Sequence, residues 1–228
     1  MVTMITTMTT ITTIDYPTLP VKDGRMDWDM FAEELAAASD ECVALLTELI
    51  PTPEITAERG TPEWSIEWFA QRAAADERSL ELMKYNARLV VQVGKAIAAI
   101  TPNFRSLDVS YEGSGDDGEI SDITVYLDRP ALYDADGNRR PYTHEENQVE
   151  NAKSDAANEC LTKKLRSWLD ETCWSIAYAQ HPGFEIDAGG FGNLRVEPED
   201  EDVEDSKLVL RISHTERVER YLDDVELA

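Results

Sequence analysis

Apolar residues recur at helical spacing in two long runs near the N-terminus, and this pattern limits the chain to folds that cover two long amphipathic helices. The first run starts at Asp27 and ends at the sequence IPTPE. The second covers 63–100, and the Thr61-Pro62 pair before it suits the N-cap and the first position of a helix. Because each apolar stripe needs a partner, we expect a helical hairpin.

The period of alternation changes to two after Pro102. Residues 104–113 and 120–130 alternate as neighbouring antiparallel strands do. A third helical pattern covers about 146–180, and the strand-like stretches FGNLRVEPE and SKLVLRISH follow it. The sequence therefore predicts an α+β fold, with an N-terminal helical hairpin followed by a small antiparallel sheet of about four strands packed on one long helix. The expected parts are a flexible Thr-rich N-terminal tail (1–24), the helical hairpin (25–102) and an α+β domain (103–228).

Charge is the most unusual feature of the composition. The 228 residues include 46 Asp and Glu against 21 Lys and Arg, which gives a formal net charge of −25. Such a chain repels nucleic-acid phosphates and anionic lipid, so direct nucleic acid binding is not expected. A basic protein partner is expected instead, because opposite charges attract.

The cysteines and the hydropathy pattern indicate a cytoplasmic protein. Cys42, Cys160 and Cys173 are an odd number without CxxC spacing, and we interpret them as reduced core residues. The N-terminal residues lack the positive region and long apolar block of a signal peptide, and no apolar run is long enough to span a membrane.

The glycine-rich sequence GSGDDGEI lies between two predicted strands. A phosphate-binding loop is excluded, because a strand rather than a helix follows and Asp116 and its acidic neighbours would face the phosphates. A hairpin turn is favoured, with Gly113, Gly115 and Gly118 supplying positive φ angles. Calcium or magnesium binding by the loop carboxylates is the alternative.

The sequence DADGNRRPYTHE partly matches a calcium loop. Asp134, Asp136 and Asn138 occupy the first, third and fifth places of an EF-hand loop, and Glu145 occupies the twelfth. The glycine is at the fourth place rather than the sixth, and two helices are not predicted around it. We therefore favour a turn and predict no cofactor, with calcium or magnesium at these four residues as the alternative.

Polar residues also gather near the end of the third predicted helix and the last predicted strand. If these two elements adjoin, two histidines and nearby carboxylates converge, and such a set suits a metal ion. The simpler interpretation is that His181 ends its helix and His214 ends its strand, since no HExxH spacing ties the histidines to one element. The candidate polar cluster consists of Asp116, His181, Glu185, Asp187, His214 and Arg217.

Three segments in order, FRSLDVSYEGSGDDGEISDITVY, CWSIAYAQHPGFEIDAGGFGNLRVE and LVLRISHTERV, resemble an uncharacterised bacterial domain-of-unknown-function family, number 6878, over about residues 104–218. The resemblance implies a compact α+β domain of no established activity, found largely among mobile-element and plasmid genes. Phe184 stands where the family usually has Trp, and the insert around DADGNRRPY is longer than expected. The matching positions are Gly113, Gly115, Asp116, Gly118, Ile120, His181, Gly183, Phe184, Glu185, Gly189, Gly192, His214 and Arg217.

The chain carries no GxSxG or Walker motif, and GSGDDG, which has the GxGxxG spacing, is followed by a predicted strand rather than the helix of a Rossmann fingerprint; this favours a non-enzymatic protein over an enzyme. The leading hypothesis is an acidic accessory or adaptor protein that binds a basic protein partner, within a mobile-element or phage-defence system. One alternative is a DNA mimic that inhibits a nucleic-acid-binding protein. The other is a metal-binding, hydrolase-like domain that uses Asp116, His181, Glu185 and His214.

Overall fold

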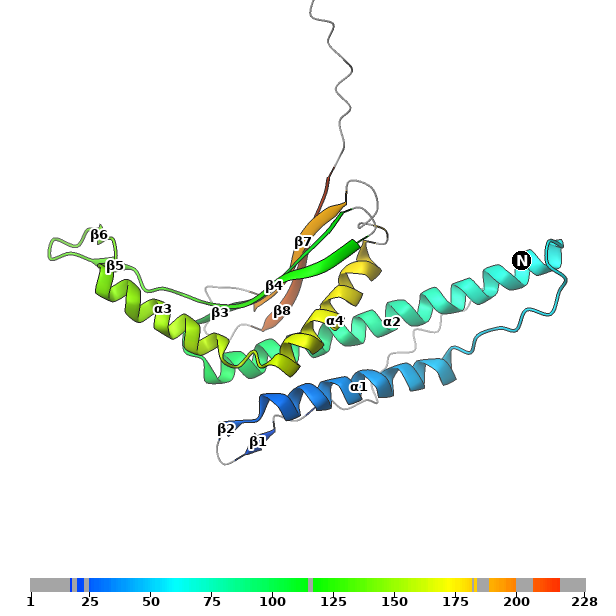
Figure 1. Ribbon diagram of the computed structural model, residues 1–228, viewed down its shortest axis with the longest axis horizontal. Coiled ribbons are helices and arrows are strands. Elements are labelled where there is room, and N and C mark those ends of the chain that lie inside the picture. Colours follow the sequence, from blue (N-terminus) through cyan, green and yellow to red (C-terminus); the bar gives the residue numbers. More distant parts are fainter. Residues whose placement is uncertain are drawn as a thin grey trace, which may run out of the picture.

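The computed structural model describes residues 17, 20–22, 25–114, 117–181, 183, 189–199 and 207–217. These residues form four α-helices, one four-stranded antiparallel sheet and two small two-stranded sheets (Figure 1). The predicted α+β fold class is therefore confirmed. Among the described residues, no helix has both the length and the apolar character needed to cross a membrane.

The first two helices form an antiparallel hairpin; the second starts at its predicted cap, and the first starts directly after Asp27, where its run was expected to begin. Helix α1 is Trp28–Leu49, and the carboxylate of its N-cap Asp27 accepts a hydrogen bond from the Met30 amide at 3.0 Å. Helix α2 is Pro62–Ile100, and the hydroxyl of its N-cap Thr61 accepts one from the Trp64 amide at 3.1 Å. These bonds satisfy amide groups that have no partner inside the helix.

The main sheet has the strand order β4-β3-β7-β8, and every neighbouring pair is antiparallel. Strand β3 is Phe104–Ser114 and β4 is Asp117–Leu127, so the glycine-rich stretch joins two paired strands, as predicted. Strand β7 is Gly190–Pro198 and β8 is Leu208–Glu216, and these two strands form the predicted second hairpin.

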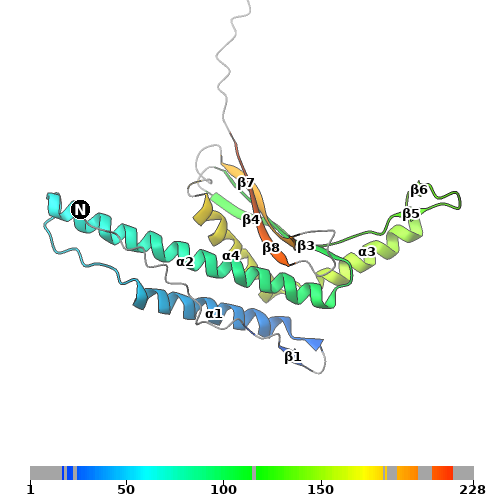
Figure 2. The same ribbon diagram turned by 180° about the vertical axis from the view of Figure 1, so that it is seen from behind.

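Helices cover one face of this sheet (Figures 1 and 2). Alternate β3 residues such as Leu107 and Val109 are buried with Leu89 of α2 and Leu169 of α4, which is Lys163–Gln180. Helix α2 crosses β7 so closely that a Cβ atom at Gly94 would lie 2.5 Å from Cγ1 of Val196. Helix α1 packs on α2 and α4 and completes the core with residues that include Phe31, Leu35 and Cys42.

The single long helix expected over 146–180 is two helices. Helix α3 is His144–Asn158, and α4 has its own N-cap, Thr162, whose hydroxyl accepts from the Leu165 amide at 3.3 Å. Ala157 is the one buried residue of α3, so this polar helix leaves the core. With the hairpin of β5 (Leu132–Tyr133) and β6 (Arg139–Arg140), α3 forms an arm that projects from the molecule (Figure 1).

Part of the expected N-terminal tail is paired. Strand β1, Val21–Lys22, is antiparallel to β2, Arg25–Met26, and the Asp27 amide donates to the Pro20 carbonyl at 2.9 Å. The other positions of 1–24, apart from Pro17, lie outside the described residues. The regular structure therefore begins before residue 25.

Candidate functional site

Two members of the predicted polar cluster meet at the glycine-rich end of the sheet. His181 is the C-cap of α4, and His214 lies in β8. Their imidazole rings stack with centroids 4.0 Å apart and planes 14° from parallel. Arg217 turns elsewhere, because its guanidinium contacts the Gly113 carbonyl at 3.3 Å and the Glu112 carboxylate at 3.4 Å. Asp116, Glu185 and Asp187 lie outside the described residues.

Tyr111 of β3 completes this arrangement, and the sequence did not single it out. Its ring is parallel to that of His214 within 10°, and its hydroxyl lies 3.0 Å from Nδ1 of His214. The same hydroxyl donates to the Ser213 carbonyl at 3.2 Å. Burial raises the pKa of Tyr111. The group therefore acts as a neutral hydroxyl that orients the imidazole of His214.

The glycines around this stack provide room for its side chains. A Cβ atom at Gly190 would lie 2.7 Å from Cε1 of His214, and one at Gly192 would lie 2.5 Å from the Tyr111 hydroxyl. Gly113 and Gly118 pair with each other across β3 and β4. Neither has a positive φ angle, so that prediction is wrong for these two, while Gly115 lies outside the described residues. A Cβ atom at Gly118 would lie 2.0 Å from the Trp174 ring.

The stacked histidines predict a pH effect on stability. Burial, and then the adjacent His181, lower the pKa of His214 from its usual value of 6.5. A depressed folded pKa means that the unfolded chain binds the proton more readily, so His214 contributes stability above about pH 6.5 that is lost as pH falls through the folded pKa. We expect the melting temperature to fall between about pH 7.5 and 5.5. His181→Gln should reduce this slope because it removes the neighbouring positive charge.

His144→Gln is the matched control for that measurement. His144 begins α3 on the projecting arm and is exposed, so its replacement should leave the pH slope unchanged. Melting temperatures at each pH are measured by circular dichroism. Equal slopes of melting temperature against pH for His181→Gln and the parent chain would contradict the predicted effect of His181 on His214.

The predicted EF-hand-like residues form a hairpin turn. Oδ1 of Asp134 accepts from the Asp136 amide at 3.0 Å and from the Asn138 amide at 2.8 Å, and these bonds lower the pKa of Asp134. Glu145 lies apart from the turn, in the first turn of α3. Asp134 thus has a structural role, as expected for a β5–β6 turn. Within the described part of the chain, no three His, Cys, Asp or Glu side chains are grouped as a metal site.

The three cysteines are buried free thiols, as predicted. Burial raises the pKa of Cys42 and of Cys160 to about 11, and it also raises the pKa of Cys173. At neutral pH these thiols are protonated, so none is a ready nucleophile.

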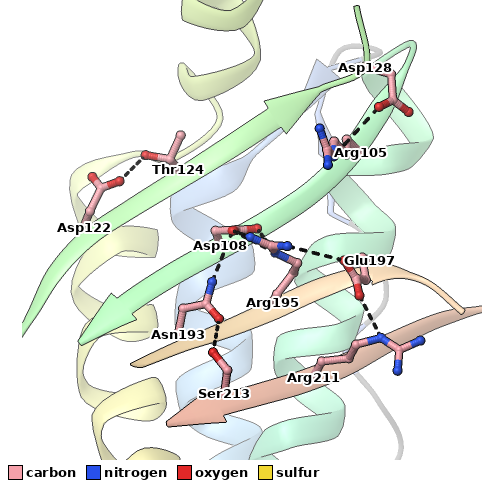
Figure 3. A network of polar contacts seen from close by, with 10 residues as sticks. All are labelled: Arg105, Asp108, Asp122, Thr124, Asp128, Asn193, Arg195, Glu197, Arg211 and Ser213. Carbon is pink, nitrogen blue, oxygen red and sulfur yellow. Dashed lines mark hydrogen bonds and ion pairs between the residues drawn. The ribbon is translucent and has the colours of Figure 1, made fainter. Parts of the chain in front are cut away.

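The sheet face opposite the helices carries a polar ladder (Figure 3). Oδ2 of Asp108 accepts from Nε and Nη2 of Arg195 at 2.8 and 2.6 Å, and Glu197 binds Arg211 at 2.7 Å. The Asp108 side chain is only 8% exposed. Asn193 extends the ladder to Ser213 with a 2.7 Å bond. The ladder joins β3, β7 and β8. Its two arginines, Arg195 and Arg211, are both paired with carboxylates of the sheet.

Helix α2 projects well beyond α1 (Figures 1 and 2). Ser39 of α1 binds the side-chain oxygen of Asn86 in α2 at 2.9 Å. In an antiparallel pair this places the last residue of α1, Leu49, beside about residue 76. Roughly the first 14 residues of α2, about 20 Å, therefore have no α1 beside them. No residue of 62–82 is buried.

The link between α1 and α2 covers one side of this projecting end. The Thr56 and Ala57 amides donate to Oε2 of Glu67 at 2.7 and 2.8 Å, and Nε2 of Gln71 donates to the Pro53 carbonyl at 3.3 Å. These amide bonds lower the pKa of Glu67. Glu67 and Gln71 lie on one side of α2, so the opposite side stays open.

The open side carries an apolar stripe, which we define as Ile66, Phe69, Ala73 and Leu80. Its members are at positions i, i+3, i+7 and i+14 and therefore share one face of the helix. Ile66 is 70% exposed, Phe69 64% and Leu80 46%. The expectation that the apolar face of the second helical run has a partner is wrong at Phe69 and Leu80.

Acidic groups surround the apolar stripe. Residues 27–81 contain 14 Asp and Glu but three Lys and Arg. Asp76 pairs with Arg72 at 3.1 Å, and Glu81 pairs with Lys84 at 2.7 Å. Glu63 and Glu77, which lie along one side of the stripe, have no ion-pair partner in the part of the chain that the structure describes. The projecting end thus combines exposed apolar area with uncompensated negative charge.

Comparison with known proteins found no matching family profile, no matching curated protein and no matching solved structure. The resemblance to the bacterial family described above therefore stays a prediction.

Proposed function

We propose that this protein is a non-enzymatic adaptor that binds a basic protein partner through the projecting end of α2. The observation that carries the proposal is the exposed apolar stripe beside Glu63 and Glu77. Exposed apolar patches with a polar rim are typical of interaction sites. An acidic rim selects a partner of opposite charge and speeds its encounter with the protein.

Other features support an adaptor over an enzyme. The three thiols are protonated at neutral pH, and the ring nitrogen Nδ1 of His214 faces the Tyr111 hydroxyl inside the sheet. The apolar stripe also favours a protein partner over DNA mimicry, since a mimic of DNA needs carboxylates in place of phosphates rather than exposed Ile and Phe. Buried free thiols suit the reducing cytoplasm, where we place the protein. A mobile-element or phage-defence context would follow from the family resemblance alone.

Affinity purification of the tagged full chain from its source cells tests the proposal. We expect a captured protein with an excess of Lys and Arg that dissociates as salt rises from about 0.1 M to about 0.5 M. Glu63→Gln combined with Glu77→Gln should weaken capture. Asp136→Asn combined with Glu145→Gln, on the projecting arm, is the control and should not. Capture that neither salt nor the first pair changes would contradict the proposal.

A further inference from the structure

We propose that the apolar stripe binds a single amphipathic helix of the partner, with Lys or Arg along one flank of that helix's own apolar face. This inference rests on the proposed function and specifies its recognition mode. It follows from the shape of the stripe, the charges beside it and the way the α1–α2 link is held.

The shape of the stripe fits a helix. Ile66 and Leu80 are 14 residues apart on one continuous helix. Their separation along the helix axis is therefore about 21 Å, or four turns. Apolar side chains on such a face pack between those of a second helix whose apolar residues recur three and four apart. An extended strand is a poor ligand here, because the backbone groups of α2 are already used within the helix.

The charges beside the stripe select a basic helix. Glu63 and Glu77 lie along the same side of the apolar residues, and neither forms an ion pair among the described residues. Lysine or arginine side chains on the flanks of a docked helix reach such carboxylates while their aliphatic stems cover apolar surface. The partner helix is therefore expected to be basic on the side of its apolar face that meets Glu63 and Glu77, since Asp76 on the other side of the stripe is paired with Arg72.

The same charges disfavour a second copy of this chain as the occupant. Two copies packed stripe to stripe would bring their flanking carboxylates together, and each chain carries a net charge of −25. The chain's own link is also excluded as the occupant, because Glu67 and Gln71 hold it on the other side of α2.

Three synthetic helical peptides of about 18 residues provide the test. The first has leucines at i, i+3, i+4 and i+7 with lysines along one flank. The second has the same composition in a scrambled order without an apolar face. The third keeps the leucine pattern but carries glutamates. Fluorescence anisotropy measures the binding of each labelled peptide to the full chain at low salt.

We expect the first peptide to bind most tightly and the glutamate peptide not to bind. Ile66→Ser combined with Phe69→Ser should weaken the first peptide at least about tenfold, because two large apolar contacts are lost. Both residues are exposed, so the fold should survive their replacement. Tyr133→Ser combined with Val149→Ser removes two equally exposed apolar groups from the projecting arm, and this matched control should leave binding unchanged.

Three outcomes would overturn the inference. Equal binding of the ordered and scrambled lysine peptides, unaffected by the stripe variant, would show that charge alone attracts the partner, and the adaptor function would stand. A dimer of the full chain that the stripe variant converts to a monomer in analytical ultracentrifugation would show that a second copy occupies the stripe. Failure of both lysine peptides to bind at low salt would overturn the inference and the adaptor function together.

Discussion

Gly189→Ala is expected to destabilise the protein by about 3 to 5 kcal/mol, from backbone strain and steric overlap combined. Gly189 has φ +75°, which L residues rarely adopt. A Cβ atom there would lie 1.8 Å from the Gly113 carbonyl oxygen and 2.8 Å from Cα of Ser114. Because both are backbone atoms, β3 and the start of β7 would have to separate. Urea denaturation measures the loss.

Gly60→Ala separates the two causes. Gly60 has φ +94°, but no atom lies within 4 Å of the position its Cβ would take. Strain alone should therefore cost about 1 to 2 kcal/mol. If Gly189→Ala lowers the free energy of unfolding no more than Gly60→Ala does, β3 and the start of β7 do not approach as closely as described.

Phe31→Ala is expected to cost about 3 to 5 kcal/mol, because it removes a large side chain from a fully buried position and leaves a cavity. Phe31 is 0% exposed and contributes to the contact of α1 with the rest of the core. Its loss should also loosen α1. Hydrogen exchange of α1 amides, together with chemical denaturation, checks both effects.

Met30→Ala is the control for Phe31→Ala, since the neighbouring side chain is 39% exposed. We expect it to change stability by less than about 0.5 kcal/mol. Similar losses for the two variants would mean that α1 is not anchored by the face that Phe31 occupies.

Local signals allowed much of the fold to be predicted. Asp27 and Thr61 mark the helix starts because their side chains bind amides only three residues away. Alternation over 104–113 and 120–130 identified a hairpin because a sheet with one covered face needs a period of two. The break between α3 and α4 was missed, because helical periodicity continues across it while Thr162 starts a new helix.

Non-local contacts explain most of the misses. The sequence offered the convergence of His181 and His214 only as an alternative, and it gave no sign that Tyr111 would bind His214, because strand alternation marks Tyr111 only as a core residue. Gly190 and Gly192 make room for side chains distant in sequence, and a local reading of glycine points to turns instead. The exposure of Phe69 depends on where α1 ends, and periodicity within α2 does not contain that information.

Helix α2 is a single continuous element of 39 residues, whose buried residues lie between Met83 and Ile97 and whose other end contacts only the α1–α2 link among the bonds described above. This buried part of α2 packs against α1, α4 and the sheet, which fixes the direction in which the helix leaves the core. A molecule bound to the apolar stripe would therefore be held away from the sheet, at a distance set by the length of α2. The protein would then fix the distance between its partner and the sheet as well as hold the partner.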